Sequence, residues 1–219
     1  MKDAVRKRIE LKDRILEAAL EHAAFDGFGE HTFRRAIADA GIDPATARRL
    51  FPQGPAALLD WLDDWADRRM LAAVAEEDLT KLPVRRRIAR LVRARFEALA
   101  PYREAVRRAV LARGLPRHLP GGVAALWRTC DRIWKKAGFD DAESEGANGY
   151  TRRILLAGVL VATLFYWLEE DSEGYRDTWA FLDRRLEEVV NLGRLSARCA
   201  SFARIFPGFG RERTDGRTG

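Results

Sequence analysis

The residues with reactive side chains are spread along this sequence without the spacing of a catalytic or metal site. His22, His31 and His118 lie far apart and do not have the spacing of metal ligands. Cys130 and Cys199 cannot form a disulfide framework, which favours a reducing compartment. The sequence has no glycine-rich phosphate loop and no serine or cysteine nucleophile motif. We therefore predict that the protein is not an enzyme and has no catalytic residue, metal or cofactor.

The most distinctive chemistry in the sequence is apolar and aromatic. Residues 154–168 contain no charge, and tryptophans occur in the neighbouring predicted helices. A pocket between helices that is lined by such groups suits an apolar molecule, so we expect a bound isoprenoid or phospholipid. A helix that is apolar around its whole circumference is also typical of a core or a subunit interface. The candidate lipid-binding residues are Trp127, Trp134, Ile154, Val161, Leu164, Phe165 and Leu168.

The length of the uncharged run argues against a membrane span. A helix over residues 154–168 would reach about 23 Å, whereas the hydrocarbon core of a bilayer is roughly 30 Å thick. We expect the helix to be surrounded by its own protein. Glu169, Glu170 and Asp171 follow it, although the dipole of a helix favours cations at the C-terminus. Something other than local electrostatics is therefore expected to fix this end.

Apolar residues recur at three- and four-residue steps through most of the chain, which is the period of amphipathic helices. There is no β-rich run and no internal repeat, so the predicted class is all-α. The expected helices besides the apolar one cover residues 9–23, 32–40, 45–51, 56–77, 84–99, 102–112, 123–137 and the stretch after Ser172. The segment 114–122 is the clearest break between them. Carboxylates lie on charge-alternating helix faces, and this pattern indicates solvated surface.

The front of the chain has the pattern of a helix-turn-helix. Gly41 separates two short helices, and Asp43 followed by Pro44 is a typical helix start. The second helix would present its first residues to base edges, and Ala45 and Thr46 offer only a methyl and a hydroxyl. We therefore predict a helix-turn-helix that does not bind DNA specifically.

The charge balance indicates an acidic partner. Lys and Arg total 39 against 33 Asp and Glu, giving a formal net charge of +6. Nucleic acid and an anionic lipid surface would both fit, and a genome biased toward arginine and alanine would give the same balance. Residues 1–12 are charged and lack the apolar segment of a secretory signal. We predict a cytoplasmic protein that is peripherally associated with the inner face of the membrane.

The last predicted helix segregates aromatic from basic residues. Leu195, Phe202, Ile205 and Phe206 fall on one face while arginines fall elsewhere, as in a helix that lies in a membrane interface. A helix that packs on its own domain gives the same pattern. We predict these four residues as the membrane contact. The expected organisation is a front part at 1–54, a bundle for lipid binding and dimerisation at 55–193, an amphipathic segment at 194–210 and a disordered tail at 211–219.

Several short motifs together resemble a known family. They cover residues 25–27, 51–54, 64–70, 104–107, 126–134, 148–153 and 177–185. With these motifs the sequence resembles the ubiquinone-biosynthesis accessory proteins known as the Coq-nine family. The resemblance implies a TetR-like fold, with an N-terminal helix-turn-helix, a C-terminal helical bundle and a short C-terminal amphipathic helix. It also implies a homodimer that binds an isoprenoid quinone precursor and presents it to the demethoxyubiquinone hydroxylase.

The same resemblance implies where that hydroxylase would dock. Asn148, Tyr150 and Arg153 match the family's docking element, so they are the candidate partner-binding residues. Two other functions fit the same sequence. One is a TetR-like transcriptional regulator that senses an apolar ligand, and the other is a purely scaffolding dimer.

Overall fold

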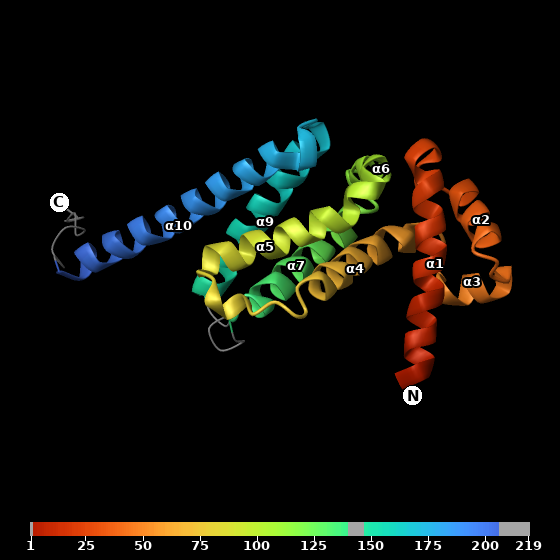
Figure 1. The fold of residues 1–219 in the computed structure, drawn as a ribbon, viewed down its shortest axis with the longest axis horizontal. Coiled ribbons are helices and arrows are strands. Elements are labelled where there is room, and N and C mark those ends of the chain that lie inside the picture. The colour runs from red at the N-terminus through yellow and green to blue at the C-terminus, as the bar shows by residue number, and fades with distance from the viewer. Residues whose placement is uncertain (1, 140–146, 206–219) are drawn as a thin grey trace, which may run out of the picture.

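The computed structural model describes the backbone of residues 2–139 and 147–205, and the side chains of residues 3–139 and 149–191. The elements in these ranges are α- and 3₁₀-helices, without a strand, so the all-α prediction is confirmed. The helices form a small front unit and a larger bundle, and α4 connects the two (Figure 1).

The front unit consists of α1 (Lys2–Asp26), α2 (Glu30–Asp39) and α3 (Pro44–Leu50). Its core is formed by fully buried side chains of α1, with the rings of Phe33 and Phe51 meeting edge-on at 6.0 Å. The predicted helix start is confirmed, because Asp43 accepts a hydrogen bond of 2.9 Å from the backbone N–H of Thr46. Gly41 has a φ of +61°, which explains the glycine between the two short helices.

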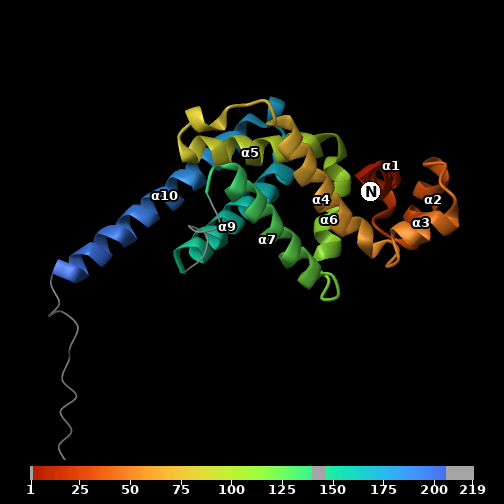
Figure 2. The same cartoon turned by 90° about the horizontal axis from the view of Figure 1, so that it is seen from below.

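The bundle follows α3 in the order α4 (Ala56–Ala73), η1 (Leu79–Lys81), α5 (Val84–Leu99), η2 (Ala100–Tyr102), α6 (Arg103–Arg113), α7 (Leu119–Lys136), α9 (Ala147–Glu169), η3 (Glu173–Tyr175) and α10 (Arg176–Ile205). Viewed along a second direction, α7 and α9 lie on one side of α5 (Figure 2). The elements come in the expected order, and the differences lie at their ends.

Several helix boundaries differ from the sequence prediction. Helix α1 starts at Lys2 instead of residue 9. Helix α4 ends at Ala73 instead of residue 77. Helix α7 starts at Leu119 instead of residue 123, because Pro120 occupies the first turn, where its missing N–H leaves no intrahelical bond unmade. Helix α10 continues through Gly193, so the expected amphipathic segment extends an existing helix.

Helix α9 is the apolar helix predicted from the sequence, and it has two different faces. Its inner face is buried against the bundle: Trp167 is fully buried and its ring lies 5.3 Å from that of Phe96 on α5. By length and composition alone the segment Gly149–Glu169 could cross a membrane, and 33% of its most apolar window is buried. The helix is longer than the uncharged run, because Arg152 and Arg153 lie near its start. The packing on α5, α7 and α10 makes it a bundle helix with one open face.

Arginines from α6 explain how α9 ends beside acidic residues. Arg103 donates to the carbonyl oxygen of Leu168 at 2.9 Å, and Arg107 donates to the same oxygen. Arg103 also donates to the carbonyl of Glu170, and Arg107 to the carboxylate of Glu169. These guanidinium groups supply the positive charge that the helix end lacks locally. The expectation that this end is fixed from outside the helix is confirmed.

Candidate functional site

The open face of α9 carries an apolar stripe, which we define as Ile154, Gly158, Val161 and Phe165. These residues follow one another at steps of four, three and four, so they lie along one side of the helix. The side chains of Ile154, Val161 and Phe165 are 50%, 37% and 54% exposed. A Cβ atom at Gly158 would meet no atom within 4 Å, so the middle of the stripe is open. Three of the seven predicted lipid-binding residues therefore lie together on the surface.

The other predicted lipid-binding residues lie elsewhere. Trp134 is 6% exposed and stacks on Phe139 with a ring separation of 4.1 Å, and Leu168 is 3% exposed in the core. Leu164 is partly buried against the core, and Trp127 is partly exposed on α7. The seven residues thus divide between a surface stripe and the packed interior, and their binding of lipid stays a prediction.

An open groove lies beside the N-terminal end of α9. It has a volume of about 780 Å³ and is lined by Leu119, Pro120, Val123, Ala124, Trp127, Arg128 and Tyr150. The rings of Trp127 and Tyr150 meet at 5.0 Å across it. The sequence pattern did not identify Leu119 and Val123 as groove residues, although they lie two turns and one turn before Trp127. The glycines and prolines around them had the composition of a loop.

The predicted partner-binding residues differ in exposure. Tyr150 is 58% exposed and available to a partner. The side chain of Arg153 is 11% exposed, donates to Asp131 at 2.7 Å and lies 5.9 Å from the ring of Trp127. Arg153 is therefore placed to hold the Trp127–Tyr150 pair more than to touch a partner directly. The side chain of Asn148 lies outside the described part.

The predicted membrane residues are at the end of the chain. Leu195, Phe202 and Ile205 are in the final turns of α10, whose side chains are outside the described part, and Phe206 lies beyond the described residues. The described end of α10 extends away from the bundle (Figures 1 and 2). Their contact with a membrane stays a prediction.

The helix-turn-helix has little capacity for direct base readout. The hydroxyl of Thr46 accepts a hydrogen bond of 2.8 Å from Arg49, and its backbone N–H donates to Asp43. The only polar group expected at the start of α3 is thus already engaged within the helix. Phosphate contacts from Arg48 and Arg49 would position the unit on DNA without specifying a sequence.

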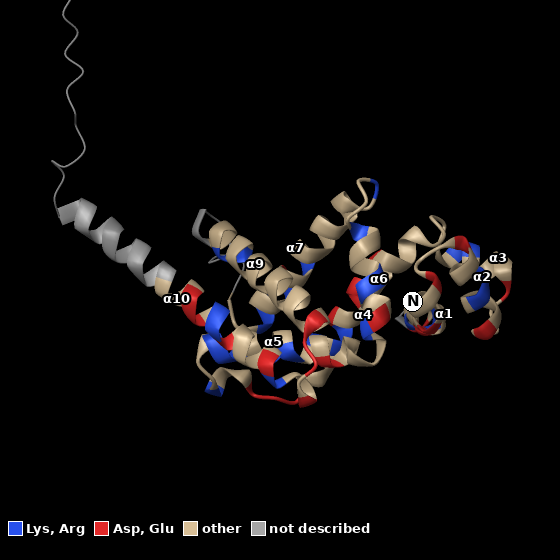
Figure 3. Ribbon diagram, turned by 90° about the horizontal axis from the view of Figure 1, so that it is seen from above, with Lys and Arg blue, Asp and Glu red and all other residues tan. Residues whose placement is uncertain are grey.

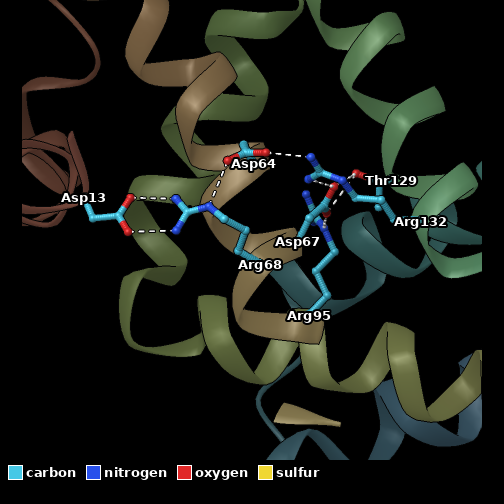
Figure 4. Close-up of polar contacts among 7 residues, drawn as sticks. All are labelled: Asp13, Asp64, Asp67, Arg68, Arg95, Thr129 and Arg132. Carbon is cyan, nitrogen blue, oxygen red and sulfur yellow. Dashed lines mark hydrogen bonds and ion pairs between the residues drawn. The ribbon is translucent and has the colours of Figure 1, made fainter. Parts of the chain in front are cut away.

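An ionic network around the buried Asp67 crosses the molecule, and the sequence pattern did not reveal it (Figure 4). Asp67 on α4 is 1% exposed and accepts hydrogen bonds from Arg95 at 2.9 Å, Arg132 at 3.0 Å and the hydroxyl of Thr129 at 2.9 Å. The expectation that the carboxylates of this helix lie on solvated surface is wrong for Asp67. An unpaired carboxylate would be costly there, so its partners are part of the fold.

The network continues from the bundle to the front unit. Arg132 donates to Asp64 at 2.7 Å, and Arg68 donates to Asp64 at 2.9 Å and to both oxygens of Asp13 on α1 at 2.6 and 2.8 Å. Burial acts to raise the pKa of Asp64, but the hydrogen bonds from Arg132 and Arg68 outweigh it and hold that pKa below its ordinary value. Burial acts to lower the pKa of Arg95, and its carboxylate partners raise it overall.

Among the described residues, no group of three or more His, Cys, Asp or Glu side chains could hold a metal ion. Burial raises the pKa of the Cys130 thiol to about 12, so this thiol stays protonated and unreactive at neutral pH. The described surface around the groove and the stripe can therefore bind a ligand mainly through apolar contacts, with Arg128 and Arg153 close by.

Comparison with known proteins supports the resemblance that the motifs predicted. The COQ9 family model matches residues 119–193. A Rattus norvegicus protein named "Ubiquinone biosynthesis protein COQ9, mitochondrial" is 28% identical over 198 residues, which cover 88% of this chain and 62% of that protein. The proteins of the same name from Homo sapiens and Drosophila melanogaster are 27% and 26% identical, covering 88% and 93% of this chain. The predicted resemblance to the COQ9 family is confirmed.

The COQ9 match contains the surfaces described above. Residues 119–193 include the groove, the stripe on α9 and the described side chains of α10 as far as Asn191. The chain spans about three fifths of the length of the curated COQ9 relatives, with coverage of 62% and 61% for the first two. A solved TetR transcriptional regulator from Nitrosomonas europaea ATCC 19718 superposes with a TM-score of 0.66 over 82% of this chain and 97% of its own, at 23% identity. This confirms the predicted TetR-like fold.

Proposed function

We propose that this chain is a non-catalytic accessory protein of ubiquinone biosynthesis. In this proposal it binds an isoprenoid quinone precursor at a membrane and presents it to the demethoxyubiquinone hydroxylase. The names of the COQ9 relatives support the pathway. Those relatives are named as mitochondrial, whereas the location expected for this chain is the inner face of a cytoplasmic membrane. That location stays a prediction.

The observation that carries the proposal is the apolar stripe on α9 next to the groove. Large side chains exposed by a third to a half along one helix face are unusual for a surface that meets only water. The stripe has no charged member, and the groove at its N-terminal end is lined mostly by apolar and aromatic groups. An isoprenoid tail is long, apolar and uncharged, so it matches the stripe in chemistry and in shape.

The groove would hold the polar end of such a lipid. The rings of Trp127 and Tyr150 can stack on a quinone-type ring, and Arg128 lies at the same groove. Arg153 fixes the ring pair through its contacts with Asp131 and Trp127. A head group held there would lie beside exposed Tyr150, the residue expected to meet the hydroxylase. Binding and presentation would then occur at one end of α9.

Mass spectrometry of lipids extracted from the purified protein tests the binding step. We expect an isoprenoid species in the wild-type protein and its loss in Val161→Asp, because a carboxylate in the stripe opposes an apolar tail. Val84→Asp is the matched control, since Val84 is similarly exposed, at 40% against 37%, but lies at the start of α5. Wild-type protein without any isoprenoid, or equal loss in both variants, would overturn the proposal.

Capture of purified demethoxyubiquinone hydroxylase on the immobilised chain tests the presentation step. Tyr150→Ala should weaken capture at least tenfold. Tyr166→Ala, which removes a 36% exposed tyrosine that stacks on Phe181 of α10, should leave it unchanged. Equal capture by both variants would place the partner surface elsewhere.

The regulator alternative makes a different prediction for DNA. A repressor shows a sequence preference beyond the salt-dependent phosphate contribution. Because the Thr46 hydroxyl is bound to Arg49, we expect binding to duplexes of unrelated sequence to be equal and to weaken together as salt increases. A preferred sequence that persists at high salt would favour the TetR-like regulator.

A further inference from the structure

The turn between α6 and α7 exposes a row of large aliphatic side chains. We name residues 111–123 the α6–α7 tip; it contains the last turn of α6, the connecting turn and the first turn of α7. Leu111, Leu115, Leu119 and Val123 are 64%, 42%, 54% and 61% exposed. They recur at every fourth position, so the exposure continues through the whole connection. Four large aliphatic groups this open on one projecting turn form an apolar patch.

The inner side of the tip is already occupied, which keeps these side chains outside. Arg113 reaches back to α4 and donates to Asp60 at 2.9 Å and to Asp63 at 2.7 Å. Its guanidinium lies so close to the turn that a Cβ atom at Gly121 would be 3.0 Å from Arg113 Nη1. A Cβ atom at Gly122 would be 3.2 Å from Arg113 Cδ. The aliphatic groups therefore cannot be buried by a simple inward rotation of the tip.

The charged residues of the tip itself are arginines, Arg113 and Arg117. The sequence has no Asp or Glu between residues 105 and 130. Asp60 and Asp63, at the base of the tip, are paired with Arg113. Arg117 and Arg128 are exposed, and Arg117 donates to His118 at 2.9 Å. This end of the molecule is drawn in tan and blue (Figure 3). A positive rim around an apolar patch is complementary to an anionic lipid surface.

The tip also projects toward the same side of the molecule as two helix ends, so a flat surface could contact all three. In Figure 2 the α6–α7 tip, the N-terminal end of α9 and the described end of α10 all extend toward the same side of the molecule. The groove opens beside the tip, because Leu119 and Val123 contribute to both. A plane that touches the tip would therefore bring the groove next to it.

We propose that the α6–α7 tip inserts its aliphatic side chains into an anionic lipid bilayer. Arg117 and Arg128 would lie at the phosphate groups, and the groove would open at the bilayer surface. A convex tip fits a deformable lipid surface, whereas a protein partner would need a matching cavity. The inference deepens the proposed function, because it gives an apolar lipid a route from the bilayer along Leu119 and Val123 into the groove.

Flotation with vesicles tests the insertion. The full chain is mixed with vesicles of phosphatidylcholine, with or without phosphatidylglycerol. We expect Leu111→Ser with Leu115→Ser to lower the vesicle partition coefficient about tenfold or more. The control is Leu82→Ser with Val84→Ser, which removes aliphatic groups of 38% and 40% exposure before and at the start of α5. The proposal would be overturned if the two double variants partitioned equally. It would also be overturned if the wild-type protein bound equally well to vesicles with and without phosphatidylglycerol.

A local probe separates the tip from the end of α10. A nitrobenzoxadiazole label on Leu115→Cys, in a Cys199→Ser background, reports the polarity around the tip; Cys130 is buried and will not react. Blue-shifted emission on adding anionic vesicles supports insertion. Unchanged emission while the protein still floats means that another segment binds the membrane, and overturns the inference.

Lipid extraction keeps this test independent of the proposed function. Leu111 and Leu115 do not line the groove, so their double variant should still carry an isoprenoid when it is loaded in detergent. Loss of flotation with retained isoprenoid supports the tip as a membrane contact. Wild-type protein that inserts its tip but never carries an isoprenoid would reject the carrier function and leave the tip proposal standing.

Discussion

Asp67 is the residue through which α4 holds α5 and α7. Its carboxylate is 1% exposed and is bonded by Arg95 and Arg132. Asp67→Asn removes the buried negative charge that the two guanidinium groups share and leaves Arg95 with Asp63 and Arg132 with Asp64. We expect a loss of about 1.5–3 kcal/mol in the free energy of unfolding, measured with urea. Asp60→Asn is the control, because Asp60 is 47% exposed and should cost less than about 1 kcal/mol. Equal losses would contradict a special role for the buried carboxylate.

The pH dependence of stability should reflect Asp64. Its pKa is held below the ordinary value of 3.8 in the folded state, so the unfolded chain takes up a proton first as the pH falls. The stabilisation from Asp64 is therefore fully present above about pH 4 and is lost as the pH falls through the folded pKa. We expect the melting temperature to decrease in this acid range, and to decrease less in Asp64→Asn. Identical acid profiles for the two proteins would contradict the lowered pKa.

At the scale of elements, Trp167 is the main anchor of α9 in the bundle. It is fully buried against Phe96 and Tyr175, with ring separations of 5.3 and 5.7 Å. Trp167→Ala should lower the free energy of unfolding by about 3–5 kcal/mol through the cavity that it leaves. Its indole N–H has no hydrogen-bond partner among the described residues, so Trp167→Phe should cost much less. Thermal unfolding of both variants measures the difference, and equal costs would mean that the N–H has an acceptor.

Local sequence signals predicted most of the elements, and tertiary contacts decided what those signals could not. Asp43 before Pro44 identified the start of α3, because a cap acts over three residues. The carboxylates of α4 looked solvated, because Arg95 and Arg132, the partners of Asp67, lie 28 and 65 residues further along the chain. The sequence pattern predicts a start of α7 four residues after the observed one, because Pro120 is compatible with both a loop and a first helical turn.

For the candidate site, too, local sequence signals identified the segment but not the tertiary contacts that decide which side chains are exposed. Composition identified residues 154–168 as the dominant apolar segment, and the motifs pointed to the COQ9 family that the comparisons also match. Periodicity could not separate the inner from the outer face of α9, because nearly every position there is apolar. Trp167 therefore lies in the core while Phe165, two residues earlier, lies in the stripe. Which face is open depends on where α5, α7 and α10 pack.

At the scale of the whole molecule, Arg68 joins the front unit to the bundle. It bonds both oxygens of Asp13 on α1 and one oxygen of Asp64 on α4. Arg68→Met keeps much of the side-chain length but leaves both carboxylates without this partner. We expect faster amide hydrogen exchange in α1–α3, with little change in α9, because the two parts would open more independently. Uniformly faster exchange would show general destabilisation. Unchanged exchange would show that the remaining contacts between α1 and α4, among them Arg69 with Glu17 and Trp61 with Asp13, are enough to couple the two parts.

The stripe on α9 also determines how the molecule would assemble. A helix with an uncovered apolar face is typical of a subunit interface as well as a lipid site, and a homodimer was predicted for this chain. If two copies pair through this face, Phe165→Asp places two carboxylates near the symmetry axis. We expect light scattering to give a dimeric mass for the wild-type protein and a monomeric mass for this variant, with a similar melting temperature because Phe165 is 54% exposed.

The isoprenoid content of the monomer then separates the two roles of α9. Lipid retained by a monomeric Phe165→Asp variant would place pairing at Phe165 and lipid binding nearer the groove, around Trp127 and Tyr150. Loss of lipid together with pairing would mean that the two copies enclose the lipid between their stripes. If the wild-type protein is a monomer that carries lipid, the whole stripe is a lipid-binding surface, because the bound lipid then covers its apolar side chains without a second copy of the chain.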